Sequence, residues 1–176
     1  LAVVGAIAAL LVAGGARVEG QVTDAEVKAE FLERFTRFVE WPADRWPDES
    51  SPFVICLVGR SPLNAVVVSR AREWRIKGRR VEVREESEPQ RMVDCDLLVV
   101  AASESSRLEW LLERTARRPI LTVGDGDGFG RRGVIVNFFL DAEVVRFEVN
   151  QRAVEASGLE LSSRLLKLAR LVESPR

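Results

Sequence analysis

The stretch that decides the fold is residues 120–150, ILTVGDGDGFGRRGVIVNFFLDAEVVRFEVN. Its composition predicts a buried strand, then a loop rich in glycine, then two strands joined by a tight turn. We expect residues 134–140 to pair with residues 144–149 across a turn at residues 141–143. Glycine at this density indicates backbone with positive φ or close packing against another element, and neither requires catalysis.

On the N-terminal side, the pattern of caps and apolar residues predicts alternating helices and strands. Thr23 and Glu26 form a capping box for a helix whose apolar stripe includes Phe31 and Phe35. Strands are expected at residues 53–58, around residues 81–83 and at residues 96–101. Ser61 is placed to cap a helix after the first of these strands, and Ser103 is placed to cap a helix after the last.

On the C-terminal side, the sequence predicts two further helices. Asn150 can cap the first, and Gly158 followed by an apolar residue is typical of its end. Ser162 or Ser163 would begin the second, in which Leu165, Leu168 and Val172 share one face.

This order of elements indicates an α/β fold in a single domain. We expect a mixed central sheet with helices on both faces and a C-terminal antiparallel hairpin. In the first three strands, the order 2-1-3 would place the strand of Cys56 beside the strand of Cys95. The length of 176 residues allows one well-filled domain and is too short to suggest two.

Charge and composition argue against a nucleic-acid partner. The formal net charge is -1, whereas binding to phosphates requires clustered positive charge. A basic stretch surrounds Trp74, but a solvated face beside a turn explains it more simply. Its members are Arg70, Arg72, Arg75, Lys77, Arg79 and Arg80.

The first residues predict export. Residues 1–16, LAVVGAIAALLVAGGA, carry no charge and resemble the apolar core and small-residue processing site of a signal peptide. They are too few for a comfortable membrane span, and no cysteine at the expected cleavage point indicates a lipid anchor. We expect residues 1–20 to be a signal peptide truncated at its start, and residues 21–176 to be a periplasmic domain without a direct membrane anchor.

Cys56 and Cys95 are the two cysteines of the chain. An even number in an exported protein favours a disulfide, and two free buried thiols are the alternative. Without a histidine, the pair cannot complete a tetrahedral zinc site.

Catalytic and cofactor chemistry finds little support. The chain has no His or Tyr, and Lys occurs only at positions 28, 77 and 167, so the usual pairs of nucleophile and base are missing. Asp125 and Asp127 resemble the start of a calcium loop, but the twelfth position is Val136 instead of Glu. The glycines also fail the dinucleotide-binding pattern. We expect no enzymatic activity, no metal and no cofactor.

Five segments carry a resemblance to a known family. They are FLERFTRFVEWP at residues 31–42, PFVICLVGRSPL at 52–63, CDLLVVAASE at 95–104, residues 118–150, and AVEASGLELSSRLLKLARLV at 153–172. Together they resemble the YfiR family of exported repressors of membrane diguanylate cyclases. The resemblance implies a periplasmic α/β domain, usually a homodimer, that binds the periplasmic domain of a YfiN-type cyclase and lowers cyclic di-GMP synthesis.

Cys56 and Cys95 match the disulfide pair of the family, whereas a second pair that many members have near the final hairpin is missing. The other matching positions are expected to serve turns, caps and packing. They are Gly128, Phe129, Gly133, Asn137, Phe147, Asn150 and Gly158.

Two hypotheses about binding follow. In the first, the partner contacts Arg131 and Arg132 in the glycine-rich loop and Arg146 and Glu148 in the last strand. We expect the two strand residues to point outward, because they alternate with the apolar residues Val145, Phe147 and Val149. Charges that merely keep the strand soluble are the alternative. In the second, the domain senses a small periplasmic molecule without direct cyclase repression, at a rim formed by residues 59–62, 102–104 and 124–129.

Overall fold

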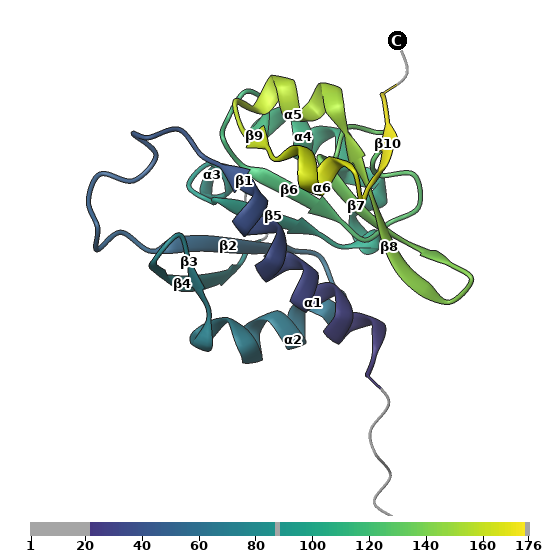
Figure 1. The fold of residues 1–176 in the computed structure, drawn as a ribbon, viewed down its shortest axis with the longest axis horizontal. Coiled ribbons are helices and arrows are strands. Elements are labelled where there is room, and N and C mark those ends of the chain that lie inside the picture. Colours follow the sequence, from purple (N-terminus) through teal and green to yellow (C-terminus); the bar gives the residue numbers. More distant parts are fainter. Residues whose placement is uncertain (1–21, 87–88, 175–176) are drawn as a thin grey trace, which may run out of the picture.

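A computed structural model of the chain describes residues 22–86 and 89–174 (Figure 1). The predicted signal peptide at residues 1–20 lies outside the described residues. The helices are α1 (Asp24–Phe35), α2 (Pro62–Arg70), α3 (Pro89–Met92), α4 (Leu108–Thr115), α5 (Gln151–Ser157) and α6 (Ser163–Leu166), with 3-10 turns at Thr36–Phe38, Ala71–Glu73 and Ala102–Arg107. The strands are β1 (Val39–Glu40), β2 (Phe53–Val58), β3 (Arg75–Ile76), β4 (Arg79–Glu85), β5 (Leu97–Val100), β6 (Leu121–Gly124), β7 (Val136–Asp141), β8 (Val144–Asn150), β9 (Glu160–Leu161) and β10 (Arg170–Val172).

A mixed sheet of eight strands forms the centre of the described domain, in the order β10-β8-β7-β6-β5-β2-β4-β3. Five neighbouring strands run parallel to one another, namely β4, β2, β5, β6 and β7. In contrast, β8 pairs with β7 antiparallel, and β10 runs parallel to β8. The predicted 2-1-3 order is confirmed, because β2 lies between β4 and β5. The short strands β1 and β9 pair separately.

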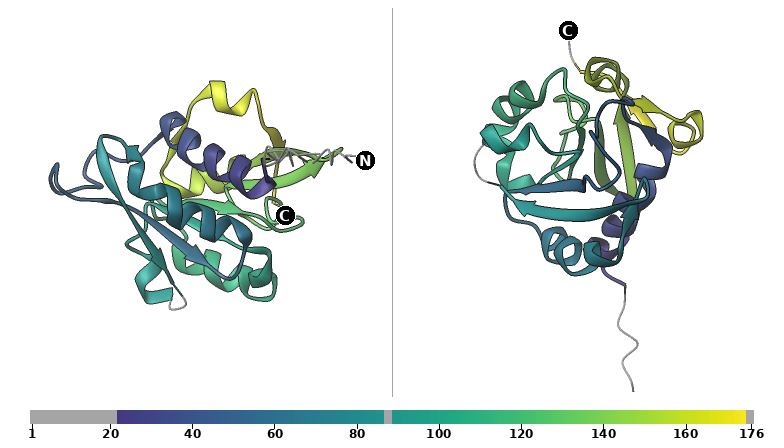
Figure 2. Two further views of the ribbon diagram at one scale, coloured as in Figure 1. Left: turned by 90° about the horizontal axis from the view of Figure 1, so that it is seen from below. Right: turned by 90° about the vertical axis from the view of Figure 1, so that its left-hand side faces the viewer.

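Helices cover both faces of the sheet, as predicted (Figures 1 and 2). On one face α1 and α2 pack side by side over alternate residues of the parallel strands, among them Ile55, Leu97 and Val123. On the other face α3 and α4 cover Cys56, Leu98 and their neighbours. Strands buried on both faces explain the continuous apolar runs in the sequence.

Aromatic rings attach α1 to the hairpin formed by β7 and β8. The predicted capping box is present, because the Thr23 side chain and the Glu26 carboxylate bond each other's backbone N–H groups. At the other end of the helix, the ring of Phe35 lies 4.7 Å from that of Phe147 and 5.8 Å from that of Phe138, between ring centroids. The first described helix is thereby fixed to a late part of the chain.

The first hairpin strand begins two residues later than predicted, the second ends one residue later than predicted, and the turn is tighter. The strands begin at Val136 and Val144, and the turn has two residues, Ala142 and Glu143, with φ values of 47° and 64°. Positive φ at both positions is typical of a type I′ turn, which usually contains Asn or Gly, so the sequence gives little signal for it. Residues 134 and 135 do not extend the strand because their N–H groups bond to Phe129 O and Thr122 Oγ1.

The predicted last helix is wrong beyond its first turn. α6 ends at Leu166, and residues 170–172 form the edge strand β10, which pairs with residues 148–150 of β8. Leu168, assigned to the buried face of that helix, is exposed, whereas Leu165 and Val172 are buried. The neighbouring strand edge overrides the helical spacing of the leucines, because backbone pairing and tertiary packing can outweigh local propensity.

Candidate partner-binding site

Phe129 anchors the glycine-rich loop between β6 and β7. Its ring is buried and packs so closely on Gly126 that a Cβ there would lie 2.5 Å from the ring. Its carbonyl accepts hydrogen bonds from the N–H groups of Arg132 and Val134, each at 3.1 Å. Gly128 and Gly133 have φ values of 71° and 109°, so the glycines serve both positive φ and close packing, as predicted.

Glu148 is buried, and the prediction that it lies on the surface is wrong. Its side chain does point away from Val145, Phe147 and Val149, but the glycine-rich loop and the Arg170 side chain of β10 cover it on that face of β8. The carboxylate, 3% exposed, accepts hydrogen bonds from Asn137 Nδ2 at 3.1 Å and from Arg170 Nη2 at 2.5 Å. A Cβ at Gly130 would lie 2.5 Å from Glu148 Oε1. Glu148 therefore joins β8, β10 and the loop.

Two asparagines extend this buried network. Asn137 Nδ2 also donates to Gly126 O at 3.0 Å, and Asn150 Nδ2 donates to Gly130 O at 2.7 Å and to Ser174 Oγ at 2.8 Å. Asn150 Oδ1 accepts from Ala153 N at 3.0 Å and caps α5, as predicted. Asn137 and Asn150, like Gly158 with its φ of 75°, thus act in packing and capping.

The three predicted arginines have separate surroundings. Arg146 is exposed near the hairpin turn, where Nε lies 2.9 Å from Asp141 Oδ2. Arg131 is exposed in the glycine-rich loop. Arg132 lies against α4, donating to Glu109 Oε1 and Ser105 Oγ at 2.8 Å each, and its hydrogen bond holds the pKa of Glu109 below the ordinary value. Arg146 and Arg131 are accessible to a partner, whereas Arg132 already has internal partners.

Exposed apolar side chains gather where the β7–β8 hairpin lies beside residues 168–170. Seven large apolar residues among those described are markedly exposed, and four of them form what we call the hairpin corner: Leu140 (49%), Val144 (52%), Leu168 (74%) and Leu171 (47%). A groove runs along this corner, lined by Phe139, Leu140, Asp141, Arg146, Phe147, Leu168, Ala169 and Arg170. In Figure 1 the green hairpin extends beyond the rest of the sheet.

The charges at the hairpin corner are paired. The Arg170 guanidinium lies 3.7 Å from the centroid of the Phe139 ring while bonding to Glu148, and Arg146 bonds to Asp141. No pattern in the sequence indicates this surface, because Leu168 and Val172 fit a helical stripe equally well. Large apolar side chains exposed beside a groove favour a contact site on a folded protein.

The rim predicted for a small ligand is occupied by its own side chains. Asp125 bonds to Lys28 Nζ at 2.5 Å and to Ser61 Oγ at 3.2 Å. The prediction that Ser103 caps a helix is wrong: its Oγ accepts a hydrogen bond from Arg60 N at 2.9 Å instead. Shallow grooves border this rim, one beside Lys28 and Ser61 and one beside Arg60.

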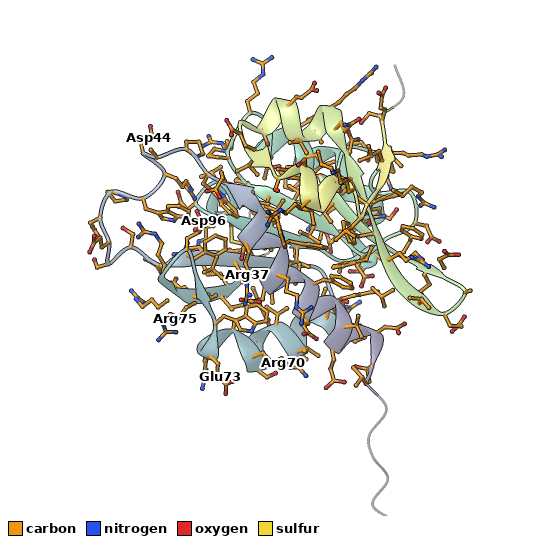
Figure 3. The ribbon with its side chains drawn as sticks, in the orientation of Figure 1. Arg37, Asp44, Arg70, Glu73, Arg75 and Asp96 are labelled. Carbon is orange, nitrogen blue, oxygen red and sulfur yellow. A yellow bond between two sulfur atoms is a disulfide. The ribbon has the colours of Figure 1, made fainter. Side chains whose placement is uncertain are left out.

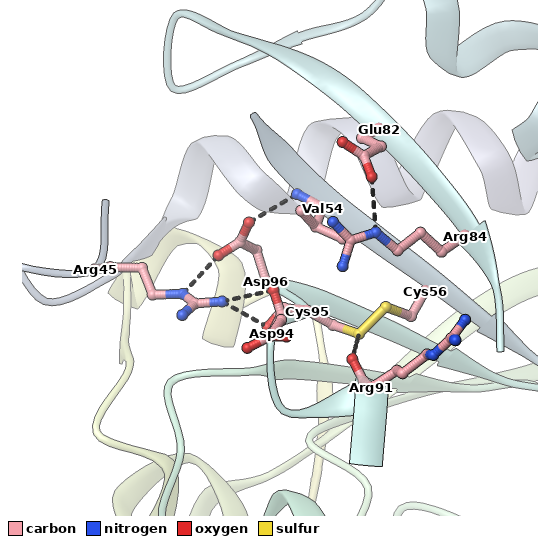
Figure 4. The surroundings of a disulfide bond; sticks show 9 residues. All are labelled: Arg45, Val54, Cys56, Glu82, Arg84, Arg91, Asp94, Cys95 and Asp96. Atoms are coloured by element: carbon pink, nitrogen blue, oxygen red, sulfur yellow. Dashed lines mark hydrogen bonds and ion pairs between the residues drawn. A yellow bond between two sulfur atoms is a disulfide. The ribbon is translucent and has the colours of Figure 1, made fainter. Parts of the chain in front are cut away.

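The Cys56–Cys95 disulfide is present, with a Cα–Cα distance of 5.9 Å (Figure 4). It links β2 to the segment entering β5, as the predicted strand order requires. Arg45 lies beside it and donates to the carbonyl oxygens of Asp94 at 3.0 Å and Cys95 at 3.1 Å. The disulfide and the long loop before β2 are therefore attached to the same short segment.

Asp96 holds that loop through a buried carboxylate. It accepts hydrogen bonds from Val54 N and Arg45 Nε at 2.7 Å each, and from Trp46 Nε1 at 3.3 Å. Burial raises the pKa of Asp96, against the opposing effects of the Val54 hydrogen bond and the Arg45 charge. Figure 3 shows Asp96 within the body of the domain and Asp44 out in the loop.

Several cations of the basic stretch contact the domain itself. Arg70 bonds to Glu26 at 3.1 Å, Lys77 bonds to Glu40 at 3.0 Å, and Arg79 donates to Ser51 O at 2.9 Å. Arg70 and Arg75 lie near the end of α2 and at β3 in Figure 3. These contacts fit the interpretation as a structural, solvated face.

Fold and site together define a disulfide-linked α/β domain in which the hairpin corner holds four of the seven markedly exposed large apolar residues described. A family model described as YfiR/HmsC-like matches residues 25–170. The chain therefore belongs to the YfiR/HmsC-like family, as the resemblance indicated.

A solved structure supports the fold. A conserved domain protein from Vibrio cholerae O1 biovar El Tor strain N16961 matches with a TM-score of 0.58 and 13% sequence identity. The match covers 86% of this chain but 60% of that chain, so this chain spans well under the full length of its structural neighbour. The comparison with curated proteins found no match. Within residues 22–86 and 89–174, no helix has the length and hydropathy to cross a membrane.

Proposed function

We propose that this chain is a periplasmic regulatory protein that binds the periplasmic domain of a membrane diguanylate cyclase and represses cyclic di-GMP synthesis. Its membership of the YfiR/HmsC-like family, over residues 25–170, is the observation that carries the proposal. Repression by contact requires an accessible surface, and the hairpin corner offers one. The disulfide is in keeping with the oxidising periplasm, to which a signal peptide at residues 1–20 would direct the chain.

The test is to delete the gene and to restore it in two forms. We expect deletion to raise intracellular cyclic di-GMP and to increase biofilm formation. A copy with a complete signal peptide should reverse both effects, whereas the same domain without a signal peptide, kept in the cytoplasm, should not. Unchanged cyclic di-GMP after deletion, with the cyclase expressed, would contradict the proposal.

A direct binding measurement complements the cellular one. The purified domain should bind the purified periplasmic domain of the diguanylate cyclase encoded beside its gene. Arg146→Glu and Arg131→Glu test the predicted contacts, since both side chains are exposed. We expect weaker binding with an unchanged free energy of unfolding, whereas equal affinity for both variants would remove these residues from the contact.

A further inference from the structure

Part of the β8 edge has no strand partner among the described residues. β10 pairs only with residues 148–150, so residues 144–147 have β7 on one side and an open edge on the other. Asn150 N donates to Ile135 O at 2.9 Å, which sets the alternation of hydrogen bonds along the hairpin. By that alternation, the N–H and C=O of Val145 and the N–H of Phe147 point away from β7.

The open edge coincides with the hairpin corner. The groove beside it is bounded by Arg146 and Phe147 of β8 on one side and by residues 168–170 on the other. Leu140, Val144 and Leu168 are exposed around it. An unpaired strand edge and an apolar surface at one place favour a partner that supplies both backbone hydrogen bonds and apolar side chains.

We propose that an extended, apolar segment of the cyclase's periplasmic domain adds to β8 as a strand at residues 144–147, in line with β10. The proposal rests on the function proposed above. β10, a strand of three residues, shows that the same edge accepts a further strand. The segment is apolar because the charges at this corner are already paired, Arg146 with Asp141 and Arg170 with Glu148.

A second copy of this chain fits the edge less well. Antiparallel pairing of Val145 with Phe147 of a second copy would place the two Arg146 side chains directly opposite each other. Like charges in directly opposite positions destabilise a strand pair. The segment therefore belongs to a different protein.

The backbone test compares Val145→Pro with Val145→Ala. Both variants replace the buried Val145 side chain by a smaller one, but only proline removes the backbone N–H that points to the open edge. The backbone hydrogen bonds between β8 and β7 are preserved in both variants, because this N–H does not take part in them. Calorimetric titration of each variant with the cyclase's periplasmic domain should show about tenfold or greater weakening for Val145→Pro relative to Val145→Ala. Hydrogen exchange at the Val145 and Phe147 amides should slow in the wild-type complex.

The side-chain test compares Leu168→Asp with Val68→Asp. Both replace an exposed apolar residue, but Val68 lies on α2, away from the groove. We expect Leu168→Asp to weaken binding about tenfold and Val68→Asp to leave it unchanged. If Val145→Pro does not fold, the comparison of Leu168→Asp with Val68→Asp and the hydrogen-exchange measurement still test the proposal.

The results of these experiments distinguish a failure of the strand-addition proposal from a failure of the proposed function. If the wild-type domain binds but both matched pairs have equal affinities and the two amides gain no protection, strand addition is overturned while the proposed function stands. If the wild-type domain does not bind the cyclase domain, both fail. If Val145→Pro abolishes self-association in sedimentation without changing affinity for the cyclase domain, the occupant is a second copy and the proposal is overturned.

Discussion

Glu148 and Arg146 lie two residues apart on β8 and point to the same face, yet their surroundings differ completely. Glu148 is covered by Gly130 and Arg170, whereas Arg146 lies beyond that cover and is exposed. Burial of a carboxylate is costly unless partners replace the water that it loses, and here Arg170 and Asn137 do so. Position along the strand, and not the face of the sheet, decides which charge is structural.

Charge reversal should distinguish these two residues. Glu148→Lys would bury a cation beside Arg170, and we expect a loss of about 3–5 kcal/mol in the free energy of unfolding. Arg146→Glu, on the same face of the same strand, should change it by no more than about 0.5 kcal/mol. Urea denaturation followed by circular dichroism measures both; similar losses for the two variants would contradict the burial of Glu148.

Two glycines of the loop should also respond differently to alanine. At Gly126 a Cβ would press on the buried Phe129 ring, whereas at Gly128 nothing lies within 4 Å and only the φ of 71° is unfavourable. We expect Gly128→Ala to cost about 1 kcal/mol in stability, as a left-handed alanine does. Gly126→Ala should cost about 2 kcal/mol or more, because a ring in a packed core cannot move aside freely. Thermal unfolding of both variants would test the order, and the reverse order would refute the packing argument.

At the scale of elements, the long loop before β2 is fixed by one buried carboxylate instead of by pairing. Asp96 and Arg45 join the loop to the start of β5, and Trp46 adds a third contact. The ring of Trp46 also lies 6.1 Å from that of Phe53, between centroids, so the loop covers the edge of the core. Loss of this attachment would therefore expose both the loop and the start of β2.

The raised pKa of Asp96 gives this attachment a pH dependence. Because burial raises the pKa above its ordinary value of 3.8, the folded protein keeps the proton at pH values where the unfolded chain has lost it. The resulting contribution to stability is complete below the unfolded pKa and is lost as the pH rises through the folded pKa. Relative to Asp96→Asn, wild-type stability in urea denaturation should fall as the pH rises from the ordinary pKa of 3.8 through the raised pKa of Asp96. Parallel curves for the two proteins would show that Asp96 is not responsible.

For the whole molecule, the disulfide links β2 to the segment that enters the neighbouring strand β5 and closes a loop of the chain between them. Cys56 and Cys95 are both fully buried and are separated by 39 residues, which include α2, β4 and α3. In the chain-entropy account, the link acts on the unfolded chain by restricting this loop.

Removing the disulfide should therefore lower stability without changing the fold. For a loop of this length we expect a loss of about 4 kcal/mol in Cys56→Ser/Cys95→Ser. The oxidised wild type and the double variant can be compared by urea denaturation, with and without a reductant. A reductant should destabilise the wild type alone; no difference between oxidised and reduced wild type would contradict the expected contribution.

The sequence predicts the centre of this fold better than its edges. Thr23, Ser61 and Asn150 form their expected caps, and the order of the central strands follows from connection rules, because both depend on local sequence and chirality. The cover over Glu148 and the strand at residues 170–172 depend on contacts with distant parts of the chain. Lys28 and Asp125, separated by 97 residues, and Arg45 and Asp96, separated by 51, have no local pattern at all.

The aromatic contacts between α1 and the β7–β8 hairpin also determine when the domain can be completed. Phe31 and Phe35 precede their ring partners Phe138 and Phe147 by roughly 100 residues. During translation α1 has no hairpin to pack on, so this part of the core cannot close before the hairpin has left the ribosome. Until then the aromatic side of α1 stays uncovered, and docking of the hairpin is a late step in folding of the domain.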